Sequence, residues 1–140
     1  MIFVDASAFV AILTREPEAE SYVECLNQAE SIITSSLAIF EAALAIRRKR
    51  SGGLTVARKA MAGALQAAGI SVVTLDEADA DTALDAFARY GKGQGHPAQL
   101  NMGDCFAYSA AKNRGASLLF KGNDFSKTDI KPAMSGKARG

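Results

Sequence analysis

The segment "MIFVDASAFVAIL", Met1 to Leu13, decides the fold class of this chain. Ile2 to Val4 have the β-branched and aromatic character of a short buried strand, and this run ends at Asp5. Ala6 to Leu13 follow at once with helical character, with Ser7 near the start. A strand that leads into a helix across a single acidic residue is the pattern of an α/β domain.

The rest of the chain repeats this alternation of strand and helix. Three more apolar runs predict strands: "SIITSS" (31–36), "ISVVTL" (70–75) and "SLLF" (117–120). Segments with helical periodicity separate them. We therefore expect a central, mainly parallel β-sheet of four to five strands flanked by α-helices. Ligands of such sheets bind at the carboxyl ends of the strands.

Local signals predict where the helices begin and end. Pro17 is expected in the first turn of a helix that buries Tyr22, Val23 and Leu26. The other boundary signals are Ser35 or Ser36, Thr55, Gly69, Asp76 with Asp79, and Gly91. The segment "GKGQGHPAQLN" (91–101) lacks periodicity, so we expect an exposed loop that carries the single histidine, His96.

Composition favours one compact domain in a reducing compartment. The chain has 140 residues, 49% of them hydrophobic, which fits one domain over residues 1–133 with a disordered tail at 134–140. Two cysteines make no disulfide framework, so a cytoplasmic location is expected. The chain offers no run of about 20 apolar residues for a membrane span. Its 16 Lys and Arg against 15 Asp and Glu leave the choice of partner open.

Two acids stand on helix faces that are otherwise apolar. Residues three and four apart share a helix face, so Asp104 lines up with Ala107, Tyr108 and Ala111. Glu41 lies in the same way beside the apolar stripe of its helix. Glu41 could also be a residue at the rim of the stripe, and Asp104 a first-turn acid that the helix dipole favours.

Two more acids follow predicted strands. Asp5 ends the first strand, and Asp124 lies just beyond the fourth. Asp5 could simply cap the next helix, and Asp124 could stabilise a turn. The coincidence of four such acids, with no basic residue on the same faces, favours one shared site.

A shared site of four acids needs a cation. Two carboxylates about 4 Å apart repel each other by roughly 4 kcal/mol at an effective dielectric of 20. Oxygen ligands without a His-rich or Cys-x-x-Cys pattern indicate Mg²⁺ or Mn²⁺ rather than zinc. Such ions activate water for attack on a phosphodiester and neutralise the leaving oxygen. The residues therefore predict a metal-assisted phosphodiesterase.

Four motifs together resemble those of PIN-domain ribonucleases, specifically the VapC toxins of bacterial VapBC toxin–antitoxin modules. They are "FVDASAFVAIL", "TSSLAIFEA", "NMGDCFAYSAAK" and "LLFKGNDFSKTDI". The resemblance places the catalytic, metal-binding acids at Asp5, Glu41, Asp104 and Asp124. It gives Ser7 a supporting hydrogen bond, although capping of the first helix explains Ser7 equally well. It suggests a compensating role for Asn123 or for Asp129.

The resemblance also implies an activity and partners. It implies a PIN fold, Mg²⁺- or Mn²⁺-dependent cleavage of RNA and inhibition by a cognate VapB antitoxin. It implies a homodimer, a heterotetramer or larger assembly with the antitoxin, and contact with operator DNA only through the antitoxin. Basic side chains that could bind RNA phosphates are Lys121, Lys127, Arg47 and Arg48, although the two arginines could instead form a solvated helix end.

Two other functions compete with this hypothesis. One is a noncatalytic PIN-type module that acts only through its antitoxin and operator DNA, although such a module has no use for four converging acids. The other is phosphotransfer on Asp5, but "DASA" lacks a second acid two residues on, which one such hydrolase class uses.

Overall fold

The centre of the molecule is one parallel sheet. The computed structural model describes residues 1–134 and has four strands in the order β3-β2-β1-β4. They are β1 (Ile2–Val4), β2 (Ile32–Ser35), β3 (Ser71–Val73) and β4 (Ser117–Leu119). Ile2 pairs in parallel with Ile32 of β2 and with Ser117 of β4. The predicted α/β class with a parallel sheet is confirmed, at four strands within residues 1–134.

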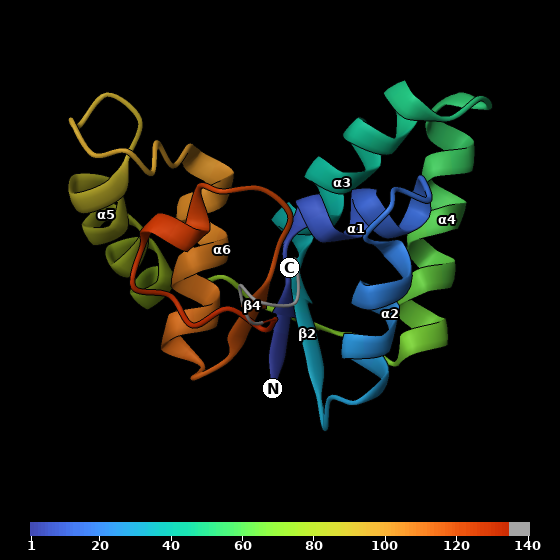
Figure 1. The fold of residues 1–140 in the computed structure, drawn as a ribbon, viewed down its shortest axis with the longest axis horizontal. Helices are drawn as coiled ribbons and strands as arrows, with labels where there is room; N and C mark the ends of the chain where they lie inside the picture. The colour runs from blue at the N-terminus through green and yellow to red at the C-terminus, as the bar shows by residue number, and fades with distance from the viewer. Residues whose placement is uncertain (135–140) are drawn as a thin grey trace.

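Six α-helices flank this sheet within the described range. They are α1 (Ala6–Leu13), α2 (Ala19–Asn27), α3 (Ser36–Lys49), α4 (Gly53–Ala68), α5 (Glu77–Tyr90) and α6 (Met102–Asn113). A short 3-10 helix, η1 (Phe125–Lys127), follows β4. Figure 1 shows α5 and α6 on one side of the sheet and α1 to α4 on the other.

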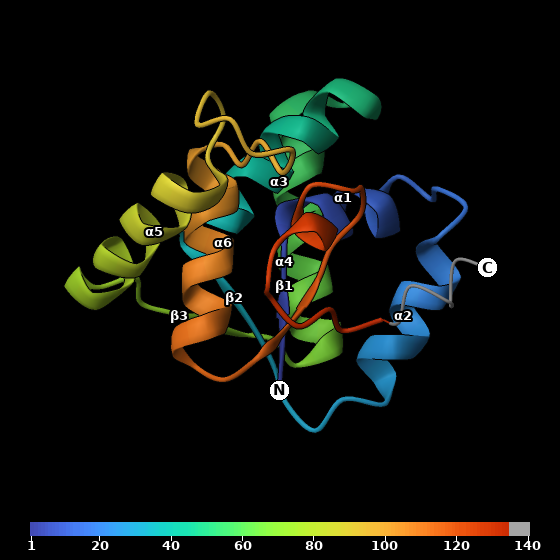
Figure 2. The same ribbon diagram turned by 60° about the vertical axis from the view of Figure 1, so that its left-hand side comes forward.

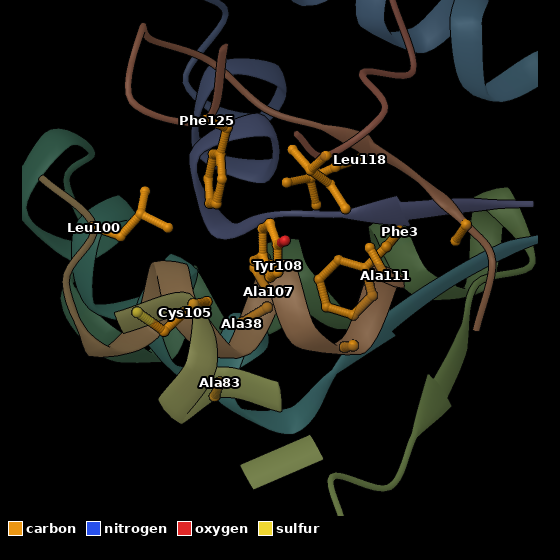
Figure 3. Close-up of a cluster of buried hydrophobic side chains, with 14 of the residues drawn as sticks. Phe3, Ala38, Ala83, Leu100, Cys105, Ala107, Tyr108, Ala111, Leu118 and Phe125 are labelled. Carbon is orange, nitrogen blue, oxygen red and sulfur yellow. The ribbon is translucent and has the colours of Figure 1, made fainter. Parts of the chain in front are cut away.

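The alternation of side chains along β1 builds a separate core on each side of the sheet. Phe3 points into the α5 and α6 side, where it joins the cluster that Figure 3 shows with Tyr108, Leu118 and Phe125. Ile2 and Val4 point into the opposite cluster with α1 to α4. All three residues of β1 are buried, as expected for the inner strand of a parallel sheet.

Most helix boundaries follow the predicted signals. The Ser35 hydroxyl accepts a hydrogen bond from the Ala38 N–H, at 3.1 Å, at the start of α3. Asp76 and Asp79 form a reciprocal capping box at the start of α5. Gly69 ends α4 in the left-handed conformation, with φ 64°, and Gly91 ends α5. These boundary signals depend only on residues that are neighbours in the chain, so they can be recognised in the sequence.

Two predicted boundaries are wrong. Helix α4 starts at Gly53 rather than after Thr55, because Gly52 turns the chain sharply with φ 99°. A Cβ at Gly52 would lie 2.1 Å from Val56 Cγ2, so only glycine fits this turn. Pro17 lies in the turn before α2, which begins at Ala19.

Burial differs from the sequence pattern at several positions. Val23, expected in the core with Tyr22 and Leu26, is 40% exposed. The 91–101 segment is a loop as predicted, but its Ala98 and Leu100 side chains are completely buried. Leu100 N–H donates to Tyr90 O at 2.9 Å, which ties the loop back to the end of α5. The predicted tail, 134–140, lies outside the described residues except for Met134.

Candidate active site

A cleft of about 460 Å³ opens at the carboxyl edge of the sheet. Figures 1 and 2 both place the start of α6 and helices α1 and α3 at this edge, above the ends of the strands. Three of the four predicted acids, Asp5, Glu41 and Asp104, line the cleft. They come from the end of β1, the middle of α3 and the first turn of α6.

Asp5 is the buried member of this group, with 5% of its surface exposed. Its Oδ2 accepts hydrogen bonds from Ser7 N–H at 3.0 Å and from Ser7 Oγ–H at 2.5 Å. Asp5 is therefore the cap of α1 and a cleft residue at once, and Ser7 has the supporting hydrogen bond that was predicted for it. Burial raises the pKa of Asp5, against the opposing effect of the Ser7 bonds.

Glu41 reaches the cleft because α6 leaves space for its side chain. A Cβ at Gly103 would lie 2.0 Å from Glu41 Oε2, so the carboxylate occupies the volume that any other residue would fill. Burial, followed by the charges of Asp5 and Asp104, raises the pKa of Glu41 to about 7. Glu41 is therefore within electrostatic reach of both other acids of the cleft.

Asp104 caps the start of α6 and also lines the cleft. Asp104 Oδ2 accepts from Asn101 N–H at 3.1 Å, and Asp104 N–H donates to Asn101 Oδ1 at 2.8 Å, in a capping box at the start of α6. Burial raises the pKa of Asp104 to about 6, and the charges of Asp5 and Asp124 act in the same direction against the Asn101 hydrogen bond. A cap alone would not place the carboxylate among other acids.

Asp124 lies at the edge of this group. Its side chain is exposed at the start of η1 and does not line the cleft. Its charge nevertheless raises the pKa of Asp104, which places the two carboxylates near each other. The structure thus brings together three of the predicted acids and leaves the fourth at the rim.

The chemistry of these side chains fits a hard divalent cation. None of the ion pairs found within residues 1–134 includes Asp5, Glu41, Asp104 or Asp124, so no direct ion pair neutralises these carboxylates. Their oxygens are the ligands that Mg²⁺ and Mn²⁺ prefer. Among the described residues, however, no three His, Cys, Asp or Glu side chains already stand in metal-binding geometry.

The predicted basic residues divide between the cleft and other places. Lys121 and Arg48 line the cleft. Arg47 is exposed and lies outside the lining, and Lys127 Nζ donates to Pro97 O at 3.4 Å. Only two of the four therefore stand where a strand entering the cleft would pass.

Three other residues considered in the sequence analysis lie outside the lining of the acidic cleft. Asn123 lines a separate pocket of about 230 Å³ with Tyr22 and Phe120 and is not part of the lining of the acidic cleft. Asp129 accepts from Tyr108 Oη at 2.5 Å and from Lys112 Nζ at 2.7 Å, which gives it a structural role. His96 Nδ1 accepts from Ala98 N–H at 3.0 Å and so holds the loop in shape.

Sequence reasoning missed two residues of the site. Glu16 lines the cleft, and Gly103 makes space for Glu41. The partners of these residues lie far away in the chain, so no local spacing indicates them. The Asn101–Asp104 spacing is the one local signal that could have revealed a capping box at the cleft.

Comparison with known proteins identifies the family of this chain. The sequence model of the PIN domain family matches residues 2–131. A VapC ribonuclease of Rhizobium meliloti (strain 1021) is 46% identical over 141 residues, covering 93% of this chain and 99% of the relative. Ribonuclease VapC30 of Mycobacterium tuberculosis (strain CDC 1551 / Oshkosh) is 39% identical, covering 91% of this chain and 94% of the relative.

A solved structure shows the same fold. The crystal structure of Mycobacterium tuberculosis VapC20, described as a Sarcin-Ricin loop cleaving toxin, matches with a TM-score of 0.74 and 16% identity. The match covers 93% of this chain and 96% of that chain. The family model, the relatives and the solved structure all match nearly the whole length of this chain. The chain belongs to the PIN-domain family and, within it, to the VapC ribonucleases.

Proposed function

We propose that this protein is the toxin of a type II toxin–antitoxin module and an endoribonuclease that depends on Mg²⁺ or Mn²⁺. The observation that carries the proposal is the cleft at the carboxyl edge of the sheet. There Asp5, Glu41 and Asp104 lie within electrostatic reach of one another, and none of them takes part in an ion pair found within residues 1–134. Asp124 completes the set from the rim, and its charge reaches Asp104.

The chain's own residues orient the reacting groups. The two Ser7 hydrogen bonds fix the Asp5 carboxylate, and the Asn101 capping box fixes that of Asp104. Lys121 and Arg48 attract the phosphates of the RNA strand beside the acids. A divalent ion held by the acids would activate water and neutralise the leaving oxygen. The competing function is a noncatalytic module that only binds its antitoxin and operator DNA. It does not explain why the fold brings these acids together against their electrostatic repulsion.

The partners are part of the same proposal. We propose inhibition by a VapB antitoxin, operator contact only through that antitoxin, and a homodimer that forms larger assemblies with it. Helix α5 supports self-association, because Leu84 and Phe87 share its outer face and are 68% and 39% exposed. We propose one domain over residues 1–133 and a cytoplasmic location. Within residues 1–134, no helix is long and apolar enough to cross a membrane.

The first test is RNA cleavage with and without metal. Purified protein should cleave cellular RNA in Mg²⁺ or Mn²⁺, and EDTA should stop the cleavage. Asp5→Asn should lower the rate by at least about 100-fold, the size expected when a group that acts in the transition state is removed. The amide still accepts the Ser7 hydrogen bonds, so the circular dichroism spectrum and Tm should stay close to wild type.

Matched controls make this result specific. Asp85→Asn changes an exposed acid of α5 and should leave cleavage unchanged. Cleavage that survives in Asp5→Asn would rule out this site.

Growth arrest on expression without antitoxin, relieved by Asp104→Ala, separates a nuclease from a module that only binds. Mapping the cut ends of cellular RNA after brief induction identifies the substrate.

Metal binding should also change how stability depends on pH. The pKa of Glu41 is raised to about 7 and that of Asp104 to about 6, so the folded protein keeps protons that the unfolded chain releases near pH 4. Without metal, stability should therefore fall as the pH rises through this window. We expect a Tm about 4 °C lower at about pH 8 than at about pH 5.5 in EDTA.

A divalent ion should remove most of this pH dependence, because it neutralises the same carboxylates. Mg²⁺ or Mn²⁺ should raise the Tm more at the higher pH, and Glu41→Gln should flatten the profile measured in EDTA. The pKa values of Glu16 and Asp129 are lowered to about 2, so these acids do not titrate in this window. A Tm that is independent of pH in EDTA would contradict the proposed electrostatics.

A further inference from the structure

A cluster of ion pairs forms one wall of the cleft. Glu16 follows α1, Lys49 is the last residue of α3, and Lys121 follows β4, so the cluster joins three elements. Glu16 Oε2 lies 3.1 Å from Lys49 Nζ, and Glu16 Oε1 pairs with Lys121 Nζ. All three residues line the cleft that Asp5, Glu41 and Asp104 share.

The carboxylate is the covered member of this cluster. The Glu16 side chain is 18% exposed, whereas Lys121 is 38% and Lys49 is 53% exposed. An ammonium group has three donors, so each lysine keeps donors for a second partner after it pairs with Glu16. Each ammonium group can therefore contact a strand in the cleft while it stays paired with Glu16.

Glu16 itself is held rigidly. Its N–H donates to Ala11 O at 2.9 Å, which fixes the turn at the end of α1. Thr14 Oγ1 lies 3.1 Å from Glu16 Oε2. Hydrogen bonding from Lys121 is the main cause that lowers the pKa of Glu16 to about 2, so this carboxylate stays charged at all working pH values.

Lys121 is also tied to the acidic site through its main chain. Its N–H donates to Ser7 Oγ at 3.0 Å, and the Ser7 hydroxyl donates to Asp5 Oδ2 at 2.5 Å. Glu18 Oε2 lies 3.4 Å from Lys121 Nζ and adds a second acidic neighbour. Both ends of Lys121 are therefore fixed relative to Asp5.

We propose that Glu16 is a positioning residue that holds Lys49 and Lys121 as a fixed pair of phosphate ligands for the RNA strand beside the acidic site. This inference rests on the proposed function. Two flexible lysines lose side-chain entropy when they bind phosphate, and a partner that orients them beforehand removes part of that cost. Glu16 acts on affinity, and the acids act on the chemical step.

The test is RNA binding by proteins that do not cut the strand. Each variant is made in an Asp104→Asn background and titrated with a fluorescein-labelled, single-stranded RNA of mixed sequence in Mg²⁺. Glu16→Gln should raise the Kd about five-fold, the upper range for a partly exposed ion pair. Glu20→Gln, an exposed acid of α2 outside the cleft, is the matched control and should leave the Kd unchanged.

A double-mutant cycle separates positioning from a structural role. Lys49→Met with Lys121→Met should reduce the slope of log affinity against log salt by roughly 0.7 for each lysine. In that background Glu16→Gln should have no further effect on the Kd. In the catalytically intact chain, Glu16→Gln should raise the KM for cleaved RNA and leave kcat unchanged.

Two outcomes would overturn this inference. If Glu16 only joins the three elements, Glu16→Gln lowers the free energy of unfolding and leaves the Kd unchanged. If its carboxylate competes with phosphate for the lysines, the Kd falls. Failure of the proposed function is a different result, namely a wild-type chain that does not cleave RNA in either metal, and the binding experiment does not depend on it.

Discussion

Gly103→Ala should reduce RNA cleavage by about 100-fold, the loss that a displacement of roughly 1 Å in a reacting group produces. The new Cβ would lie 2.0 Å from Glu41 Oε2 and 2.5 Å from Glu41 Cδ, so the carboxylate must leave its place. Alanine is a better helix former than glycine, which offsets part of the cost to α6. The change therefore acts mainly on the geometry of the acids, and steady-state cleavage with urea unfolding measures both effects.

Gly63→Ala provides the matched control for this experiment. Gly63 also lies inside a helix, α4, and a Cβ there has open space around it. We expect cleavage at the wild-type rate and a gain in stability of up to about 1 kcal/mol. Wild-type cleavage by Gly103→Ala would mean that the position of Glu41 does not matter for catalysis. That outcome would remove Glu41 from the proposed site.

Asp79→Ala should lower the free energy of unfolding by about 3 kcal/mol, because it breaks a buried ion pair. Asp79 is 1% exposed, and its two oxygens accept from Arg114 Nη1 at 2.8 Å and Nη2 at 2.9 Å. The same guanidinium donates to Thr74 O at 2.8 Å, which links α6 to the segment before α5. Loss of Asp79 leaves the Arg114 charge without its partner in a site that is only partly open to water.

Urea unfolding measures this effect, and its pH dependence provides a second test. Hydrogen bonding from Arg114 is the main cause that keeps the pKa of Asp79 well below its usual range. The stabilisation is therefore present above about pH 4 and disappears as the pH falls toward the lowered pKa. The variant should lose less stability on acidification than wild type. Asp81→Ala, at an exposed position of α5, should change stability by less than about 0.5 kcal/mol.

The sequence predicts where the acids lie in the fold when a local pattern and the topology act together. Asp5 ends a strand, and the carboxyl ends of parallel strands meet at one edge, so its place followed from the alternation of strands and helices. Asp104 and Glu41 were visible as charges on apolar helix faces. The alternative interpretation of Asp104 as a first-turn acid of its helix also holds, because the same side chain caps α6 and lines the cleft.

Contacts between distant segments were not predictable in this way. Glu16 pairs with Lys49 and Lys121, which are 33 and 105 residues away in the chain. No local spacing in the sequence predicts these contacts. Helix α5 shows a similar limit, because it packs Ala83 and Ala86 inward and leaves the larger Leu84 and Phe87 exposed. Hydrophobicity alone favours the larger side chains for the core, whereas close packing against α6 selects the small ones.

The order of the strands in space has a consequence for synthesis of the protein. Strand β1 is made first, yet one of its two neighbours in the sheet is β4, which pairs Ile2 with Ser117. Asp104 and Lys121 also come from the last third of the chain, whereas Asp5 is among its first residues. A nascent chain on the ribosome therefore cannot assemble the acidic cleft until almost all of it has emerged. The acidic cleft is therefore a late product of synthesis, since it needs both Asp5 and Lys121.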